Sequence, residues 1–330
     1  MPDRFSGNNR HRASKSCASL PKDANIETDS MAIATTGSFA KREADELLRR
    51  VTVRIAAAAK SQGIDEMHDL RVATRRFIGS LAALPLCFPR GESKRMRRGL
   101  KRIMAEAGAV RNYDVAMHVI ARLELPQSGG LLRQLQKRRD SAASTLSASL
   151  HRWKARDLPA RWRAAVNSGR GHRDADADCN ASPIQLTAKR ILSDMVGEHF
   201  RRGEAATAKK TPAHKIHRFR IAAKNFRYTL VFFAPLYADS LATPIDRLKE
   251  IQTLLGDIND CATVRRIIKE ESDDDIRKTI LSALRKRQRK KIKDFRDQYA
   301  AEFSSAAALR QWQETVRRVV TRTTDKHPLS

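Results

Sequence analysis

One pattern occurs twice in this chain, and its repetition limits the possible folds more than any other feature. In each copy a His, an Arg and a second basic residue stand at positions i, i+3 and i+7. The copies are 149 residues apart, and they contain His68, Arg71 and Arg75, then His217, Arg220 and Lys224. At about 100° per residue, this spacing places all three side chains on one helix face under about 90° wide. The pattern therefore predicts two halves built alike, each with a cationic helix face suited to an anionic ligand.

The overall charge indicates the same kind of partner. The chain holds 65 Lys and Arg against 37 Asp and Glu, a formal net charge of +28. An excess of this size favours association with a polyanion and says little about the fold. Nucleic acid, an anionic membrane surface and inorganic polyphosphate are the candidate partners. With 330 residues, 41% of them hydrophobic, the chain can bury one large core or two modest ones.

Cysteine usage and hydropathy predict a protein of the reducing cytoplasm. The four cysteines, Cys17, Cys87, Cys179 and Cys261, are scattered without a C-x-x-C pair, so neither a disulfide framework nor a zinc site is expected. No apolar stretch approaches the roughly 18 residues that a membrane span needs. The N-terminal residues lack a hydrophobic signal-peptide core and are rich in Ser, Asn and Arg, so we expect a disordered tail over residues 1–38.

The rest of the chain predicts an all-α fold, because apolar residues recur at intervals of three and four. Residues 167–183 are crowded with Gly, Ser, Asp and Asn and predict a flexible linker. It separates a first helical half, 39–166, from a second, 184–322, with a short tail over 323–330. We expect a bundle of helices in each half. The predicted helices span residues 41–60, 65–84, 92–123, 131–153, 158–166, 184–201, 213–233, 254–268, 276–303 and 306–321.

A second element follows each copy of the motif at nearly the same distance. Gly108 begins the segment Gly-Ala-Val-Arg-Asn, which ends at Asn112, and Gly256 begins Gly-Asp-Ile-Asn-Asp, which ends at Asp260. The two glycines are 148 residues apart, one less than the histidines. Two elements in the same order at matching offsets indicate an internal duplication.

Together these motifs resemble the CHAD family, the conserved histidine α-helical domain. The resemblance covers roughly residues 39–320. It implies two pseudo-symmetric four-helix bundles whose basic faces meet in a central groove that binds inorganic polyphosphate, with no catalytic activity and no cofactor. The binding positions that it implies are His68, Arg71, Arg75, Arg76 and Arg111 in the first half and His217, Arg220, Lys224, Arg227 and Tyr228 in the second.

The chain departs from the family pattern in two places. Asn112 stands where the family usually has an acidic residue, and Asn225 stands where the first copy has the cation Arg76. The second departure predicts unequal binding by the two halves. Family members are often fused to a triphosphate-tunnel domain with an E-x-E-x-K signature, which is absent from this sequence, so a triphosphatase activity is not implied.

Several residues have a second interpretation. His68 and His217 either donate to phosphate or hold the helix start by bonding a carboxylate or carbonyl, and the sequence favours neither. His68-Asp69 also resembles the metal-binding pair of HD phosphohydrolases, but that site needs further His and Asp residues. Asp257, Asn259 and Asp260 suit a divalent cation, although contacts to basic neighbours are the favoured interpretation.

Two other groups of residues favour simpler interpretations. The aromatic residues Phe226, Phe232, Phe233 and Tyr237 have the spacing of bundle core rather than of a stacking platform. The basic runs 94–98 and 285–291 carry almost one sign of charge, so we expect them to extend the cationic surface that flanks the groove.

The sequence therefore supports three functions in decreasing order. Polyphosphate binding on granules in the cytoplasm comes first, because it alone explains the duplicated face. Nonspecific nucleic-acid binding comes second, and a metal-dependent phosphohydrolase third. No Ser-His-Asp set, Gly-rich phosphate loop or carboxylate pair stands out, which favours a binding protein over an enzyme.

Overall fold

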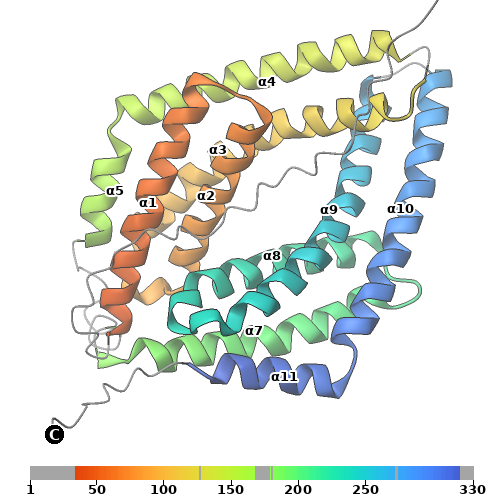
Figure 1. Cartoon of the computed structure of the whole chain (residues 1–330). Helices are drawn as coiled ribbons and strands as arrows, with labels where there is room; N and C mark the ends of the chain where they lie inside the picture. Colours follow the sequence, from red (N-terminus) through yellow and green to blue (C-terminus); the bar gives the residue numbers. More distant parts are fainter. Residues whose placement is uncertain (1–33, 126–127, 168–178, 180, 272–273, 320–330) are drawn as a thin grey trace, which may run out of the picture. The chain divides into compact units, whose positions relative to one another are not determined.

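The computed structural model describes residues 34–125, 128–167, 179, 181–271 and 274–319. These residues form α-helices joined by short turns, and no β-strand is present among them (Figure 1). The elements are α1 (Thr36–Lys60), α2 (Ile64–Ala83), η1 (Pro85–Cys87), α3 (Arg90–Ala121), α4 (Gly129–Ala155), α5 (Leu158–Asn167), α7 (Ile184–Thr207), α8 (Ala213–Phe233), η2 (Ala234–Leu236), η3 (Ala238–Leu241), α9 (Ala242–Glu271), α10 (Asp274–Phe303) and α11 (Ala306–Arg317). The predicted all-α class is confirmed.

Local sequence signals set several helix ends. Thr35 caps α1 by accepting the backbone N–H of Ser38, and Ser305 caps α11 in the same way. Asp65 and Glu66 lie in the first turn of α2, where their negative charges stabilise the helix by interacting with the positive end of its dipole.

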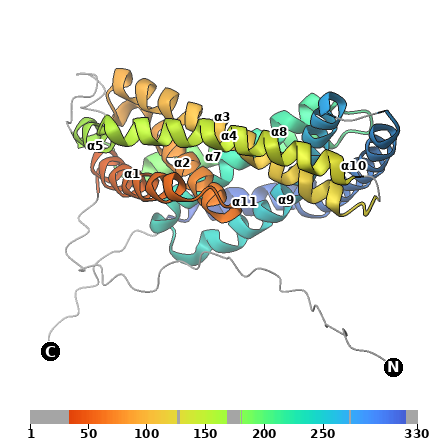
Figure 2. The ribbon, with the colours of Figure 1, turned by 90° about the horizontal axis from the view of Figure 1, so that it is seen from above.

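The second half of the chain repeats the helix pairs of the first. α1 packs against α2 and α5, and α3 packs against α2 and α4, while α7–α11 repeat these four pairs in the same order. The equivalent helices of the two halves also touch, since α1 contacts α7, α2 contacts α8 and α3 contacts α9. Figures 1 and 2 both show α3 beside α4 and α9 beside α10. The duplication seen in the sequence therefore extends to the packing of the helices.

The starts of the two halves are joined by a symmetric pair of backbone hydrogen bonds. The Thr36 N–H donates to the Ser182 carbonyl at 2.9 Å, and the Ile184 N–H donates to the Ala34 carbonyl at 3.1 Å. The two donors, Thr36 and Ile184, are 148 residues apart, and so are the two acceptors, Ala34 and Ser182. The two donors are therefore equivalent residues of the two repeats, and so are the two acceptors. Each repeat thus presents the same segment to the other, as in an isologous interface between two subunits.

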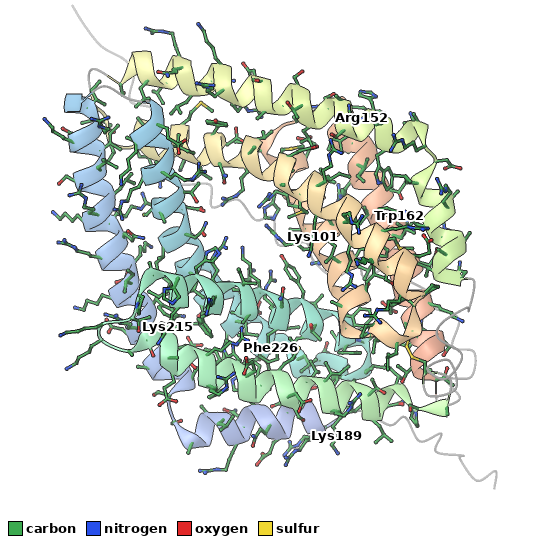
Figure 3. All side chains as sticks on the ribbon, turned by 180° about the vertical axis from the view of Figure 1, so that it is seen from behind. Lys101, Arg152, Trp162, Lys189, Lys215 and Phe226 are labelled. Atoms are coloured by element: carbon green, nitrogen blue, oxygen red, sulfur yellow. A yellow bond between two sulfur atoms is a disulfide. The ribbon has the colours of Figure 1, made fainter. Side chains whose placement is uncertain are left out.

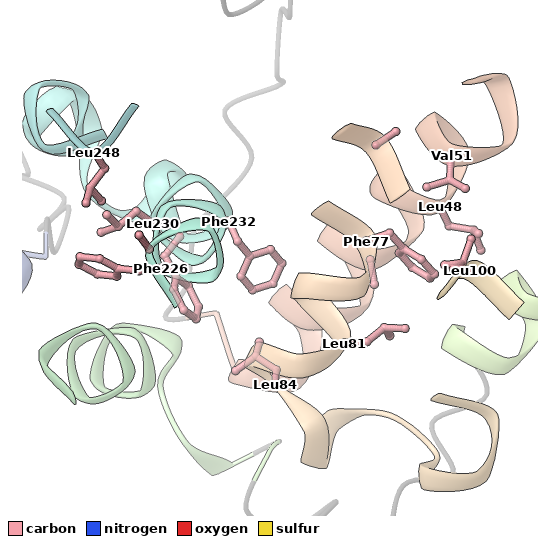
Figure 4. Close-up of a cluster of buried hydrophobic side chains, with 14 of the residues drawn as sticks. Leu48, Val51, Phe77, Leu81, Leu84, Leu100, Phe226, Leu230, Phe232 and Leu248 are labelled. Atoms are coloured by element: carbon pink, nitrogen blue, oxygen red, sulfur yellow. The ribbon is translucent and has the colours of Figure 1, made fainter. Parts of the chain in front are cut away.

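The main hydrophobic core is continuous across the two halves. Buried residues of α1, α2, α3 and α5 form one cluster with those of α7, α8, α9 and α11. In Figure 4, Phe77 of α2 lies with the first-half side chains and Phe226 of α8 with the second-half ones. Phe232 of α8 joins the halves, because its ring lies 5.4 Å from that of Phe39 in α1. A second, smaller cluster joins the end of α3 and start of α4 to the end of α9 and start of α10.

Four helix ends differ from the prediction by more than three residues. α1 begins at Thr36 rather than at 41, and α9 begins at Ala242 rather than at 254. α7 continues to Thr207, whereas the sequence predicted an end at Arg201 before a break at Gly203. A β-carbon at Gly203 would collide with the Tyr299 hydroxyl and ring. This glycine within α7 therefore leaves space for the Tyr299 side chain of α10. α11 ends at Arg317 rather than near Thr321.

The prediction that the cysteines form no disulfide is wrong. Cys87 and Cys179 are bonded, with their Cα atoms 5.8 Å apart, while Cys261 is free and buried. The bond ties η1, which follows the first motif helix, to the segment before α7. Cysteines that are 92 residues apart carry no local spacing signal, so the sequence alone could not pair them.

The expected N-terminal tail up to residue 33, the tail after 319 and residues 168–178 of the linker lie outside the described residues. Within the described part, no helix is both long and apolar enough to cross a membrane.

Candidate anion-binding site

The two motif helices lie against each other and bring their cations together. Arg71 and Arg75 come from α2, while Arg220 and Lys224 come from α8 at the equivalent positions. Arg111 of α3 joins them, and its charge lowers the pKa of Arg71, Arg220 and Lys224. We call Arg71, Arg75, Arg111, Arg220 and Lys224 the central cationic cluster. Both repeats contribute residues to this cluster.

The local sequence explains why these side chains leave the core. Met67, Leu70 and Phe77 of α2 are buried, and they occupy the face that packs against α1 and α3. Ile216, Phe219 and Phe226 are their equivalents on α8. The Arg and Lys positions lie beside this apolar stripe, so the cations are half-buried instead of extending into solvent.

Partial burial next to other cations destabilises the protonated, charged forms of these side chains and so lowers their pKa values. Burial, followed by the charges of Arg220, Arg75, Arg111 and Arg71, lowers the pKa of Lys224 from 10.5 to about 7. Burial and the neighbouring arginines lower the pKa of Arg71 to about 10. An anion placed here would relieve both the desolvation and the repulsion of these groups.

Positive charge alone does not locate this site. Figure 3 shows long side chains tipped with nitrogen on every helix, and the labelled Lys101, Lys189 and Lys215 are all exposed. Exposed cations retain their water and repel one another weakly. The central cationic cluster differs because its members are partly desolvated and come from both repeats.

The equivalent arginines Arg71 and Arg220 have different surroundings. The Arg71 Nη1 donates to the Met104 carbonyl of α3 at 3.1 Å, and a β-carbon at Gly108 would lie 3.1 Å from this nitrogen. Gly108 thus leaves room for the Arg71 side chain. The buried Nε of Arg220 has no hydrogen-bond partner in the described part of the chain. Arg220 also lines a hollow of about 60 Å³ between α8, α9 and α10, with His217 and Asn259.

Arg111 connects the two repeats through an ion pair. Its Nη1 and Nη2 donate to the two carboxylate oxygens of Asp260 on α9, at 3.1 and 2.9 Å. Burial opposes the charged form of Arg111, but the hydrogen bond and charge of Asp260 outweigh burial and raise its pKa. Such two-point pairing fixes the direction of the guanidinium. The charge of Arg111 is therefore already paired with a carboxylate.

Three other predicted binding residues lie next to the cluster in a different environment. Arg227 donates from Nε to the Gln252 Oε1 at 2.8 Å, and its guanidinium lies 4.9 Å from the centre of the Tyr228 ring. Tyr228 is 7% exposed. Burial lowers the pKa of Arg76, whose buried Nε has no partner among the described residues.

The family model of the CHAD domain matches residues 42–269, more than two thirds of the chain. The chain belongs to the CHAD family. This is a family linked to polyphosphate binding.

Two solved structures share the CHAD fold of this chain. The crystal structure of the CHAD domain from the plant Ricinus communis has 19% sequence identity and a TM-score of 0.59, and the match covers 87% of this chain and 93% of that one. PptA from Streptomyces chartreusis has 15% identity and a TM-score of 0.55, covering 85% of this chain and 100% of that one. At these identities the likeness concerns the fold. No curated protein matches the sequence.

The histidine of each CHAD motif helix, His68 or His217, is exposed. Neither His68 nor His217 makes a hydrogen bond or ion pair with the described residues, so the carbonyl or carboxylate contact considered for them is not formed there. Asn225, the residue in place of a second cation, is exposed too.

The acidic and aromatic residues follow their simpler interpretations. Asp257 pairs with Lys291 at 2.8 Å and Asp260 with Arg111, so both bind basic neighbours as favoured above. Among the described residues, no three His, Cys, Asp or Glu side chains are grouped to hold a metal ion. The four aromatic residues Phe226, Phe232, Phe233 and Tyr237 are buried, which confirms the core interpretation.

Sequence reasoning missed two residues near the site. Gln252 of α9 is buried, accepts from Arg227 and donates to the Ala223 carbonyl at 2.8 Å, which ties α9 to α8. Met104 contributes only its backbone carbonyl, to Arg71. A single Gln within a helix and a backbone atom leave no pattern in a sequence.

Proposed function

We propose that this protein binds inorganic polyphosphate on the central cationic cluster, without catalysing a reaction. The observation that carries this proposal is that five cations from both repeats are half-buried together, with Asp260 as the carboxylate that pairs with one of them. Partial burial of several cations together is costly unless an anion neutralises them. The family to which the chain belongs supports the same ligand.

The chemistry of polyphosphate fits this arrangement. The ligand has no base edges or aromatic faces, so its recognition depends on charge and on hydrogen bonds to phosphoryl oxygens. Arg offers a planar fork of donors to two such oxygens. Cations at i and i+4 are about 6 Å apart along a helix, so each motif helix can contact successive parts of one chain. Longer chains should bind more tightly because the contacts act on a single ligand.

A binding role suits the groups that form the cluster. The guanidinium groups of its four arginines can donate hydrogen bonds to an anion and orient it. The nearby carboxylate of Asp260 is already hydrogen-bonded to Arg111. No base is held there by a hydrogen bond to activate a water or nucleophile in the described part of the chain. We also propose association with polyphosphate granules, where this ligand is concentrated.

The test is a titration of the full chain with long-chain polyphosphate and with single-stranded nucleic acid, at one near-physiological salt concentration. We expect tighter binding of polyphosphate, with affinity falling steeply as salt rises. Tighter binding of nucleic acid would contradict the proposal and favour the nonspecific alternative. Release of phosphate that stops on chelation of metal ions would contradict the non-catalytic part.

A further inference from the structure

A second hollow, separate from the central cationic cluster, lies where the first motif helix ends. It has a volume of about 240 Å³ and lies between the end of α2, the short helix η1 and the first two turns of α3. None of the predicted polyphosphate-binding residues lines it. Its lining consists of Leu81, Pro85, Leu86, Phe88, Arg90, Ser93 and Arg97.

One wall of this hollow is cationic. Arg90, Ser93 and Arg97 stand at i, i+3 and i+7 on α3, so they share one face of the helix. The Arg97 Nε donates to the Ser93 carbonyl at 3.3 Å, which directs the guanidinium along this face. Neither arginine forms an ion pair with any residue that the structure describes. This wall is therefore able to bind a negatively charged group.

Ser93 provides a second, independent indication of a ligand. Ser93 lines the hollow and is only 3% exposed, yet its hydroxyl has no hydrogen-bond partner among the described residues. An unsatisfied buried hydroxyl is destabilising, and a ligand oxygen would satisfy it. The positive end of α3 lies here too, because Pro89 precedes the helix and supplies no capping side chain.

The opposite wall is apolar and held in place. Leu81 and Phe88 are buried, whereas Leu86 is 57% exposed and among the few large apolar side chains left in solvent. Cys87 lies between Leu86 and Phe88, and its disulfide to Cys179 anchors this segment. A wall fixed in advance loses little freedom when a ligand binds.

We propose that this hollow binds a small amphipathic anion, a short monoalkyl phosphate or carboxylate. The anionic head lies between Arg90 and Arg97 beside Ser93, and the alkyl tail covers Leu86. A volume of about 240 Å³ is below the roughly 300–1,000 Å³ of pockets for drug-sized ligands, so the tail is short. This site does not depend on whether the cluster binds polyphosphate.

Calorimetric titration with methyl, butyl and hexyl phosphate at near-physiological salt tests the proposal. The three ligands have the same head, so general attraction to a protein of net charge +28 does not separate them. Because each buried methylene is worth roughly a threefold to fourfold gain in affinity, we expect hexyl phosphate to bind at least tenfold more tightly than methyl phosphate. Equal affinities for the three would overturn the proposal.

Two variants assign the binding to this hollow, and a third serves as the control. Leu86→Ser should remove the dependence on tail length and leave methyl phosphate binding unchanged; since Leu86 is exposed, the fold should tolerate this change. Arg90→Gln should weaken all three ligands by a similar factor. The matched control Arg98→Gln removes an exposed cation of the same helix that does not line the hollow, and it should change nothing. Equal effects of Arg90→Gln and Arg98→Gln would overturn the assignment.

Decyl phosphate distinguishes a free metabolite from a lipid as the source of the anion. For a short soluble ligand, affinity stops rising once the tail fills the hollow. A continued rise from hexyl to decyl phosphate would overturn the short-ligand part and indicate a lipid tail.

Discussion

Arg111 of the first repeat forms a two-point ion pair with Asp260 of the second, with distances of 3.1 and 2.9 Å. Both residues come from the element repeated after each motif, in which Gly108 corresponds to Gly256. On this alignment Asp260 corresponds to Asn112, the position where the first repeat departs from the family pattern. The pair thus joins α3 to α9 through a carboxylate that only the second repeat has.

Asp260→Asn should increase the affinity for polyphosphate severalfold at low salt. The change removes the anion that neutralises Arg111 and competes with phosphate for it. Its cost in stability should be about 1–3 kcal/mol, because Arg111 is left half-buried without its partner. Isothermal titration and thermal unfolding measure the two effects.

Asp45→Asn is the matched control for this change. Asp45 forms an exposed ion pair with Arg163 at 2.9 Å and belongs to α1, which carries no member of the cluster. Net charge rises by the same amount in both variants. If Asp45→Asn increased affinity as much as Asp260→Asn, the effect would be one of overall charge.

Replacing Arg71, Arg75, Arg220 and Lys224 together by Gln should lower polyphosphate affinity at least about a hundredfold. Charge-assisted hydrogen bonds are each worth about 1.5 kcal/mol or more. Helical content and Tm should stay close to those of the parent, because the four groups are cations whose mutual repulsion is removed. Circular dichroism and a binding titration measure both.

Four exposed cations outside the motif helices give the control for charge. Gln at Arg152, Lys154, Lys189 and Arg190 removes the same charge from α4 and α7. This control should weaken binding only by the modest loss of long-range attraction. Collapse of the fold in the cluster variant would show instead that those side chains are structural.

Binding should weaken as pH rises from 6 to 9. The pKa of Lys224 is about 7, lowered by burial and by the neighbouring arginines, so its positive charge is lost as pH rises through that value. Polyphosphate binds the protonated amine and raises its pKa, so binding above about pH 7 takes up a proton. Titrations in buffers of different ionisation enthalpy measure that uptake.

Lys224→Arg identifies the group responsible. An arginine keeps its charge throughout this range, so the variant should bind at pH 8.5 nearly as well as at pH 6. The double variant His68→Gln/His217→Gln measures separately what the two exposed motif histidines contribute to binding at each pH. An unchanged slope in Lys224→Arg would contradict the role assigned to Lys224.

The sequence predicted the helices and a cationic face on each motif helix because both depend on short-range spacing, whereas the meeting of the two faces was implied only by the family resemblance. Positions i, i+3 and i+7 determine which face of α2 carries Arg71 and Arg75, and the offset of 149 assigns Arg220 and Lys224 to the same face of α8. Arg111 was implied as a binding position by the family resemblance. Its pairing with Asp260 was not predicted, since it depends on how α3 meets α9.

Contacts between residues distant in sequence could not be predicted in this way. A helix break was expected at Gly203, but the helix continues there and the glycine leaves space for the Tyr299 side chain. The pairing of Cys87 with Cys179 depends on where η1 lies. The buried His199 carries no motif. The first two require contacts between residues more than 90 apart, and the burial of His199 requires its helix to pack against Phe219 of α8 and Phe303 of α10.

Reduction of the disulfide should destabilise the protein without unfolding it. A bond that joins residues 92 apart restricts the unfolded chain, and such bonds contribute roughly 2–5 kcal/mol. Differential scanning calorimetry should show Tm lower by several degrees in reductant, and equally lower in the double variant Cys87→Ser/Cys179→Ser. Reductant should then have no further effect on that variant, because Cys261 is unpaired. A further drop in Tm there would contradict the assignment of the effect to this bond.

Replacing His199 by Leu should stabilise the protein, most of all below pH 6.5. His199 of α7 is 2% exposed, its two ring nitrogens have no partner in the described part of the chain, and the nearest rings are those of Phe219 at 5.0 Å and Phe303 at 5.1 Å. Burial lowers its pKa from 6.5 to about 3, so the unfolded chain binds a proton that the folded chain refuses between these values. Stability should therefore fall with decreasing pH below 6.5, by at most about 1.4 kcal/mol per unit from this residue.

Urea unfolding of the parent and His199→Leu at pH 7.5, 6.5 and 5.5 measures the difference, which should widen as pH falls. His151→Leu, a change at an exposed histidine of α4, is the control and should leave the pH dependence unchanged. A gap between parent and His199→Leu that stayed constant from pH 7.5 to 5.5 would show that His199 is already able to take up a proton in the fold.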